Sequence, residues 1–342
     1  MPVPERPILL VLRALGLGDF LTAVPALRAL RESHPYHEIV LACPRVLRPL
    51  ALLSGAVDRV VDTAPQQHPD LCHADLAVNL HGRGPQSHRV LLDTAPRRLL
   101  AYPNDAVPET RGMPQWDDEE HEVVRWCRLV AQGLGIHADP DRLDIDAPTV
   151  DAPAIARGAT VIHPGAAFAS RRWPVERWAA VARAEHLAAR TVVVTGDTSE
   201  VALARSVAEQ AGLDGSHVLA GDTDLAQLAV VVAVSARVVC GDTGVAHLAS
   251  ALRRPSLVLF GPTPPTRSGP PPRPIHRVLW ARTTGDPWAS HPDPGLLRIG
   301  VTDVLAMLSV LPAHEDSSSP EVALDGRVAH HGRTRRVQEA GA

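Results

Sequence analysis

The chain has 342 residues, a formal net charge of -4, and 45% hydrophobic and 21% charged residues. This length and composition are typical of a globular protein with room for two ordinary domains, and the slightly acidic balance argues against a nucleic-acid binder. Four cysteines without close spacing predict reduced thiols rather than a disulfide framework: Cys43, Cys72, Cys127 and Cys240.

The first part of the chain alternates short apolar runs with segments of helical periodicity. A buried strand is predicted over residues 7–13, then a glycine loop and a helix over 21–31, in which Pro25 is tolerable only near the first turn. Further strands are predicted over residues 38–42, 57–62, 74–80 and 98–102, and further helices over 46–53, from 86 onward and over 119–132. This alternation is typical of a doubly wound parallel sheet.

The pattern stops over residues 139–158, where Asp, Ala and Pro mix without either period, and restarts at 160. Strands are then predicted over 160–163, 191–195, 217–219, 238–240, 256–260 and 276–280, and helices over 175–189, 199–211, 224–235, 245–252 and 302–311. We therefore predict α/β domains at 1–138 and 159–311, a linker at 139–158, and a disordered polar tail at 312–342.

Polar loops with glycine follow several of the predicted strands, at residues 16–19, 81–84, 163–166, 195–197 and 241–244. Ligands of parallel sheets bind outside the carboxyl ends of the strands, so a ligand between the domains could contact loops of both. The turn at 241–244 opens a predicted helix, whose free N–H groups suit a phosphate. With the Thr243 hydroxyl and the cations of Arg171 and Arg172, this set suits a diphosphate, although a solvated loop would also explain the two arginines.

Three residues of these loops have a structural and a functional interpretation. Asp19 is by residue type an N-cap candidate first and a catalytic carboxylate second. Asp242 would repel a phosphate, so we expect it to hold its turn through backbone hydrogen bonds. His247 follows Gly244 by one helical turn and is equally well a ligand contact or a satisfied core histidine.

A metal site is not predicted, although the chain has 17 histidines. The spacing of His68, His73 and His81 crosses a strand and its loops, and no H-E-x-x-H pattern occurs. P-loop, G-x-S-x-G and cysteine-nucleophile signatures are also missing.

Three groups of residues resemble glycosyltransferase family 9, the ADP-heptose:lipopolysaccharide heptosyltransferase family. They are LGLGDFLTAVPA at 15–26, HPGA at 163–166 with RRWP at 171–174, and GDTGVAH at 241–247 with FGPT at 260–263. The resemblance runs from the first strand to Leu311 and omits the tail.

The resemblance implies the GT-B fold, in which two Rossmann-like domains with parallel sheets face a central cleft, with the acceptor on the N-terminal side. It implies no metal or other cofactor, and a single displacement that inverts the anomeric centre, with Asp19 as general base. The implied donor-binding residues are Gly18, Arg171, Glu200, Asp242, Thr243, Gly244 and His247. Arg171 stands where the family has a Lys, which keeps the charge but changes its shape and reach.

The leading function is therefore transfer of a sugar, heptose or related, from a nucleoside diphosphate to an acceptor hydroxyl. The acceptor would be a glycan, a lipid-linked sugar or a small molecule. Two alternatives stay open: a nucleotide-sugar binding protein that has lost catalysis, motivated by Arg171, and a nucleotide-sugar epimerase of the same fold. We expect a cytoplasmic protein without an integral membrane segment or a nucleic-acid partner, and peripheral association with the inner face of the membrane remains compatible.

Overall fold

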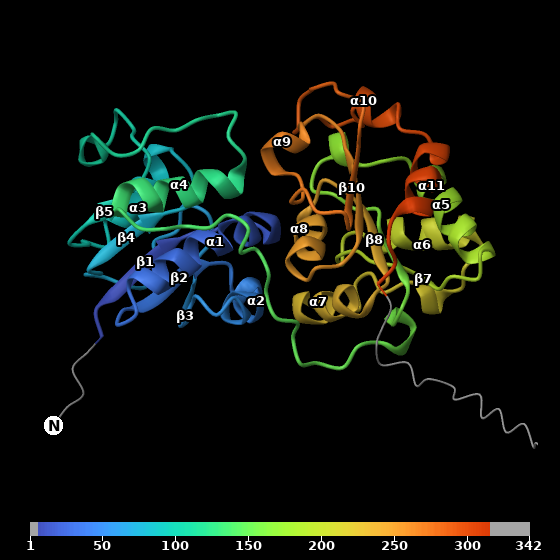
Figure 1. The fold of residues 1–342 in the computed structure, drawn as a ribbon, viewed down its shortest axis with the longest axis horizontal. Helices are drawn as coiled ribbons and strands as arrows, with labels where there is room; N and C mark the ends of the chain where they lie inside the picture. The colour runs from blue at the N-terminus through green and yellow to red at the C-terminus, as the bar shows by residue number, and fades with distance from the viewer. Residues whose placement is uncertain (1–5, 315–342) are drawn as a thin grey trace, which may run out of the picture.

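The computed structural model describes residues 6–314 and places two parallel sheets of five strands in two α/β domains (Figure 1). The disordered tail predicted from residue 312 lies, from 315 onward, outside the described residues. None of the helices within 6–314 combines the length and apolar character that crossing a membrane requires.

The N-terminal sheet has the strand order β3-β2-β1-β4-β5. Its strands are β1 (Ile8–Leu12), β2 (Glu38–Cys43), β3 (Arg59–Asp62), β4 (Leu76–Asn79) and β5 (Leu99–Leu100). Its helices are α1 (Leu17–Ser33), α2 (Arg48–Leu53), α3 (Pro85–Leu92) and α4 (Glu122–Leu134). In the register of the sheet, Leu10 of β1 lies between Val40 and Ala77. All three side chains are buried, as expected for a parallel sheet covered on both faces.

The C-terminal sheet has the strand order β10-β9-β8-β6-β7. Its strands are β6 (Thr160–His163), β7 (Val192–Val194), β8 (Arg237–Gly241), β9 (Ser256–Phe260) and β10 (His276–Trp280). Its helices are α5 (Val175–Leu187), α6 (Val201–Ala211), α7 (Leu225–Val234), α8 (Gly244–Ala251), α9 (Pro265–Ser268), α10 (Pro294–Leu297) and α11 (Val301–Val310).

Each sheet has one place where the winding reverses direction. In the N-terminal sheet it lies between β1 and β4, and in the C-terminal sheet between β6 and β8. The crevice at such a switch point, outside the carboxyl ends of the two strands, is where open α/β sheets bind ligands. We therefore expect a ligand site at the loops that follow β1, β4, β6 and β8.

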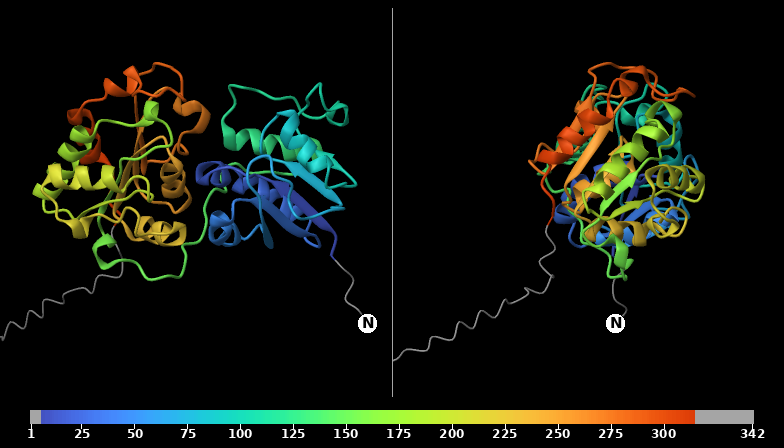
Figure 2. Two further views of the ribbon diagram at one scale, coloured as in Figure 1. Left: turned by 180° about the vertical axis from the view of Figure 1, so that it is seen from behind. Right: turned by 90° about the vertical axis from the view of Figure 1, so that its right-hand side faces the viewer.

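The two domains meet through α1 and α8, which lie side by side in both views (Figures 1 and 2). One buried apolar cluster runs from Leu9 and Val11 of β1 through α1 into α8 and on to Val238 of β8. A second cluster covers the other face of the C-terminal sheet under α5, α6 and α11. The domain contact is thus a continuation of the apolar core rather than a wet surface contact.

The structure departs from the predicted elements in several places. The first helix begins at Leu17, not 21, because Gly16 serves as N-cap and the Asp19 side chain accepts the Gly16 N–H. Pro25 consequently lies inside the helix, where its missing N–H leaves the Leu21 carbonyl without that partner.

The strand predicted over 217–219 is wrong, since a single turn ends at His217 and Val218 forms only an isolated bridge with Val194. Two short helices, α9 and α10, form where no helix is predicted, and Pro265 stands at the first position of α9, where a missing N–H is harmless.

A buried histidine makes the stability of the C-terminal domain dependent on pH. His276, at the start of β10, is 6% exposed, and its Nδ1 lies 2.8 Å from the Ser256 hydroxyl. Burial, aided by the nearby charge of Arg273, lowers the pKa of His276 from 6.5 to about 4. The unfolded chain therefore binds a proton in a pH range where the folded chain does not.

We expect the free energy of unfolding to fall as the pH drops from about 6.5 to 4, with His276 contributing roughly 2–3 kcal/mol of the loss. Urea unfolding at neutral pH and near pH 4.5 measures it. The variant His276→Asn should lose less stability between these two conditions than the parent chain does. An equal loss in both would contradict this assignment of the histidine.

Candidate active site

The loops at the two switch points carry a set of charged and hydroxyl side chains on either side of the α1–α8 contact. Asp19 follows β1 and His81 follows β4 in the N-terminal domain. Arg171 lies in the loop after β6, and Asp242 and Thr243 follow β8 in the C-terminal domain. The structure thus brings most of the residues expected from the sequence to two facing sheet edges.

Asp19 is the accessible carboxylate of the N-terminal edge. It is the third residue of α1, its Oδ2 accepts the Gly16 N–H at 3.2 Å, and its side chain is 40% exposed. The N-cap interpretation is therefore wrong in detail, because Gly16 is the cap and Asp19 supports it from the first turn. The carboxylate still has lone pairs that face away from the helix and can accept a further proton or hydrogen bond.

Arg13 lies behind Asp19, a position that the sequence reasoning did not single out. Its side chain is 1% exposed, its Nε donates to the Asp19 main-chain oxygen at 2.8 Å, and its Nη2 lies 3.5 Å from Asp19 Oδ1. The same Nη2 lies 2.6 Å from Oε1 of Glu122, the first residue of α4. The sequence offers one sign of this role: Arg13 ends a predicted strand that is otherwise apolar. Its partner Glu122 lies 109 residues away, so local patterns could not identify the pair.

Asp242 and Arg171 form the charged pair of the C-terminal edge, with Arg171 Nη1 3.6 Å from Asp242 Oδ2. Burial raises the pKa of Asp242, and the Arg171 charge opposes that rise. Within residues 6–314 no backbone N–H donates to the Asp242 carboxylate, so the predicted turn-holding role is corrected: its partner is a guanidinium.

Two polar atoms beside this pair have no hydrogen-bond partner in the described part of the chain. They are Thr243 Oγ1 and Arg171 Nε, both inaccessible. A buried polar group without a partner destabilises a protein by about 1–3 kcal/mol. Because Thr243 is also the residue before α8, these atoms lie next to the free N–H groups of a helix N-terminus, and an anion bound there would satisfy them.

Gly18, Gly244 and His247 form the contact between the two edges. A Cβ on Gly18 would lie 2.7 Å from His247 Cδ2, and a Cβ on Gly244 would lie 3.2 Å from the Gly18 nitrogen. Both glycines are therefore needed for α1 and α8 to approach this closely. Burial lowers the pKa of His247, which is consequently neutral near pH 7.

Glu200 lies one strand further along the C-terminal edge, at the start of α6. Its Oε2 accepts the Asp197 N–H at 3.1 Å and lies 3.9 Å from His163 Nε2. Burial raises the pKa of Glu200, and burial lowers that of His163 to about 4, so the histidine is neutral near pH 7. Glu200 thus borders the β6–β7 side of the same edge rather than the Arg171–Asp242 pair.

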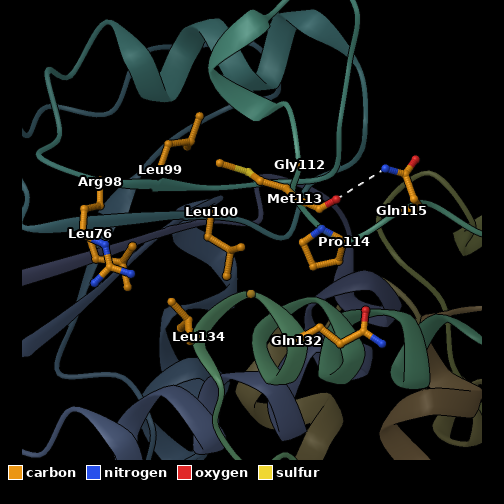
Figure 3. Close-up of a pocket in the computed structure, with 11 residues that line it drawn as sticks. Leu76, Arg98, Leu99, Leu100, Gly112, Met113, Pro114, Gln115, Gln132 and Leu134 are labelled. Carbon is orange, nitrogen blue, oxygen red and sulfur yellow. Dashed lines mark hydrogen bonds between the residues drawn. The ribbon is translucent and has the colours of Figure 1, made fainter.

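Two hollows of about 440 Å³ on the described surface lie elsewhere. One, of about 440 Å³, is formed by β5, the segment 112–115 and the last turn of α4 (Figure 3). Its residues Leu76 and Arg98 stand at the amino ends of β4 and β5, the edge opposite to the switch points. A third hollow, of about 10 Å³, lies beside His247 among α1, α4, α8 and the segment 269–271. We favour the switch points because they hold the unsatisfied polar atoms.

Comparison with known proteins identifies the family and the fold. The model of the family "Glycosyltransferase family 9 (heptosyltransferase)" matches residues 110–286, slightly more than half of the chain. A search of curated protein sequences finds no match.

Three solved structures illustrate the likeness. ADP-heptose lps heptosyltransferase II of E. coli has a TM-score of 0.71 at 21% identity, covering 89% of this chain and 98% of that chain. A family 9 glycosyl transferase of Veillonella parvula has a TM-score of 0.73 at 18% identity, covering 91% and 98%. E. coli heptosyltransferase WaaC with ADP-2-deoxy-2-fluoro heptose has a TM-score of 0.67 at 19% identity, covering 88% and 99%. These likenesses confirm the predicted GT-B fold.

The glycine contact between the domains predicts a specific sensitivity. Gly18→Ala should force His247 or the whole of α8 to move, so amide exchange at residues 244–248 should become faster. The added variant His247→Ala should restore protection, because it removes the atom that the new methyl group meets. Gly82→Ala is the matched control, since nothing lies within 4 Å of a Cβ there. Unchanged exchange in Gly18→Ala would refute the close contact.

Proposed function

Because the chain belongs to glycosyltransferase family 9, we propose that it moves a heptose or related sugar from a nucleoside diphosphate to an acceptor hydroxyl, inverting the anomeric centre without a metal. The observation that carries this proposal is the position of Asp19 and Arg171 at the switch points of two facing sheets. A carboxylate on one edge and a guanidinium on the other supply the two functions that such a displacement needs.

The donor diphosphate would bind the C-terminal edge. The guanidinium of Arg171, the Thr243 hydroxyl and the free N–H groups of Gly244 and Val245 would neutralise and orient it. His247 stands beside this N-terminus, and Glu200 on the β6–β7 side would accept hydrogen bonds from the donor ribose. The neighbours named for ADP-heptose and ADP-2-deoxy-2-fluoro heptose make an ADP-sugar the first donor to test.

The acceptor would lie on the N-terminal side, with its hydroxyl against Asp19. In the reaction the acceptor oxygen forms a bond to the anomeric carbon while its proton passes to the Asp19 carboxylate. The bond between the anomeric carbon and the diphosphate oxygen breaks, and its electron pair leaves with the nucleoside diphosphate. The growing negative charge on that oxygen is met by Arg171 and the α8 N-terminus.

Replacing the proposed base tests the mechanism. Asp19→Asn keeps the size of the side chain but removes its ability to take a proton, so we expect release of nucleoside diphosphate to fall by roughly 10²–10⁴-fold. The dissociation constant for ADP, measured by calorimetry, should stay within about twofold because Asp19 lies on the other domain from the donor residues.

The same experiment separates the alternatives. Donor binding without turnover in the parent chain, unchanged in Asp19→Asn, would indicate a binding protein that has lost catalysis. Conversion of the nucleotide sugar to an epimer without loss of nucleoside diphosphate would indicate an epimerase.

Replacing the proposed diphosphate cation tests the donor site. Arg171→Ala removes a charge-assisted contact, so we expect the dissociation constant for ADP to rise roughly ten- to a hundredfold. Arg171→Lys should retain most of the affinity, since the charge stays. Arg183→Ala, on the outer helix α5, serves as control for loss of a cation remote from the site. Equal affinity in Arg171→Ala would contradict the assignment.

A further inference from the structure

Arg13 is a fully buried cation held on several sides. Its Nε donates to the main-chain oxygen of Asp19 at 2.8 Å, and its Nη1 donates to that of Leu80. Its guanidinium carbon lies 4.6 Å from the centre of the Trp126 ring. A charge this deeply buried needs an anionic partner, because the loss of hydration is costly.

Three acceptors compete for one nitrogen of Arg13. Nη2 lies 2.6 Å from Glu122 Oε1, 3.2 Å from Thr22 Oγ1 and 3.5 Å from Asp19 Oδ1. The distances assign the charge of Arg13 to Glu122 and leave Asp19 with a long, weak contact. Burial acts to raise the pKa of Glu122, but the Arg13 guanidinium outweighs it and lowers the pKa, so Glu122 is an anion near neutral pH.

We propose that Glu122 is a positioning residue for sugar transfer: by holding the charge of Arg13, it leaves the Asp19 carboxylate available as a base. The inference rests on the proposed role of Asp19. Arg13 fixes the first turn of α1 through the Asp19 main chain, and Thr22 reinforces this by donating to the same oxygen at 2.8 Å. The side chain of Asp19 is thereby oriented, while its own contact with the guanidinium stays long, at 3.5 Å.

Without the charge of Glu122, Asp19 would be the remaining carboxylate within 4 Å of Arg13 among the described residues. Nη2 would then turn toward Asp19 Oδ1. A close cation stabilises the deprotonated form of a carboxylate and makes it a weaker base.

The other titratable groups around Asp19 are two histidines, and neither adds a positive charge near pH 7. His81, from the loop after β4, has its pKa lowered by burial and then by Arg13. His247, from α8, has its pKa lowered by burial, against the charges of Asp242, Glu122 and Asp19. Both rings are therefore neutral near pH 7.

The start of α4, where Glu122 lies, also contacts the other domain. The preceding residue, His121, is the N-cap of α4, and its Nε2 lies 3.1 Å from the main-chain oxygen of Gly269, just after α9. The first residue of α4, Glu122, therefore lies next to a hydrogen bond that joins the two domains.

The test is the kinetics of Glu122→Gln, which keeps the size of the side chain and an oxygen for the Trp126 N–H. We expect kcat near pH 7 to fall roughly three- to tenfold while KM for the donor stays unchanged. The acid limb of the kcat profile should move to lower pH by about one pH unit. Glu122→Asp, which keeps the charge at shorter reach, should recover part of both.

The matched control is Glu120→Gln. It breaks a comparable ion pair, with Arg128 at 2.8 Å, two residues earlier, and should leave kcat and the pH profile unchanged. If Glu122→Gln does not fold, Glu122→Asp decides, with a smaller shift in the same direction expected. An unchanged pH profile, even with lower thermal stability, would overturn the inference. Full turnover in Asp19→Asn would instead overturn the proposed function.

Discussion

The close approach of α1 and α8 is the constraint on which the rest of the structure depends. Gly18 and Gly244 have no side chains of their own at this contact, so the N-termini of the two helices meet across the domain boundary. Each terminus carries partial positive charge and free N–H groups, and their convergence favours a bound anion. The apolar core continues through the same contact, which fixes the two switch points opposite each other.

The two edges carry similar ion pairs with opposite exposure. In the N-terminal domain Arg13 is buried and Asp19 is accessible, whereas in the C-terminal domain Asp242 is buried and Arg171 is the more accessible member. The two contacts have nearly the same length, 3.5 and 3.6 Å. One edge therefore presents a carboxylate to the space between the domains and the other presents a guanidinium. In each pair the less buried member is the one that a ligand can contact. In the N-terminal pair, Glu122 also neutralises the charge of the buried Arg13.

Local patterns in the sequence were enough to predict most of the fold. Apolar runs marked all ten strands of the described residues to within a few residues, although β5 has only two residues where five were predicted. The strand predicted at 217–219 does not form, because His217 ends a single helical turn and Val218 makes only an isolated bridge. At the site, Asp19 and Arg171 followed from loop position and family resemblance. The Arg13–Glu122 pair and the guanidinium partner of Asp242 are contacts between distant segments, and no local periodicity carries that information.

A crystal structure of the chain with an unreactive nucleoside-diphosphate sugar tests the central claim most directly. The account predicts that the diphosphate lies at the start of α8, within hydrogen-bond distance of the Thr243 hydroxyl and the Arg171 guanidinium. It also predicts that the Asp19 carboxylate faces the anomeric carbon from the side opposite the diphosphate. A nucleotide bound in the hollow between β5 and α4, or an anomeric carbon turned away from Asp19, would contradict it.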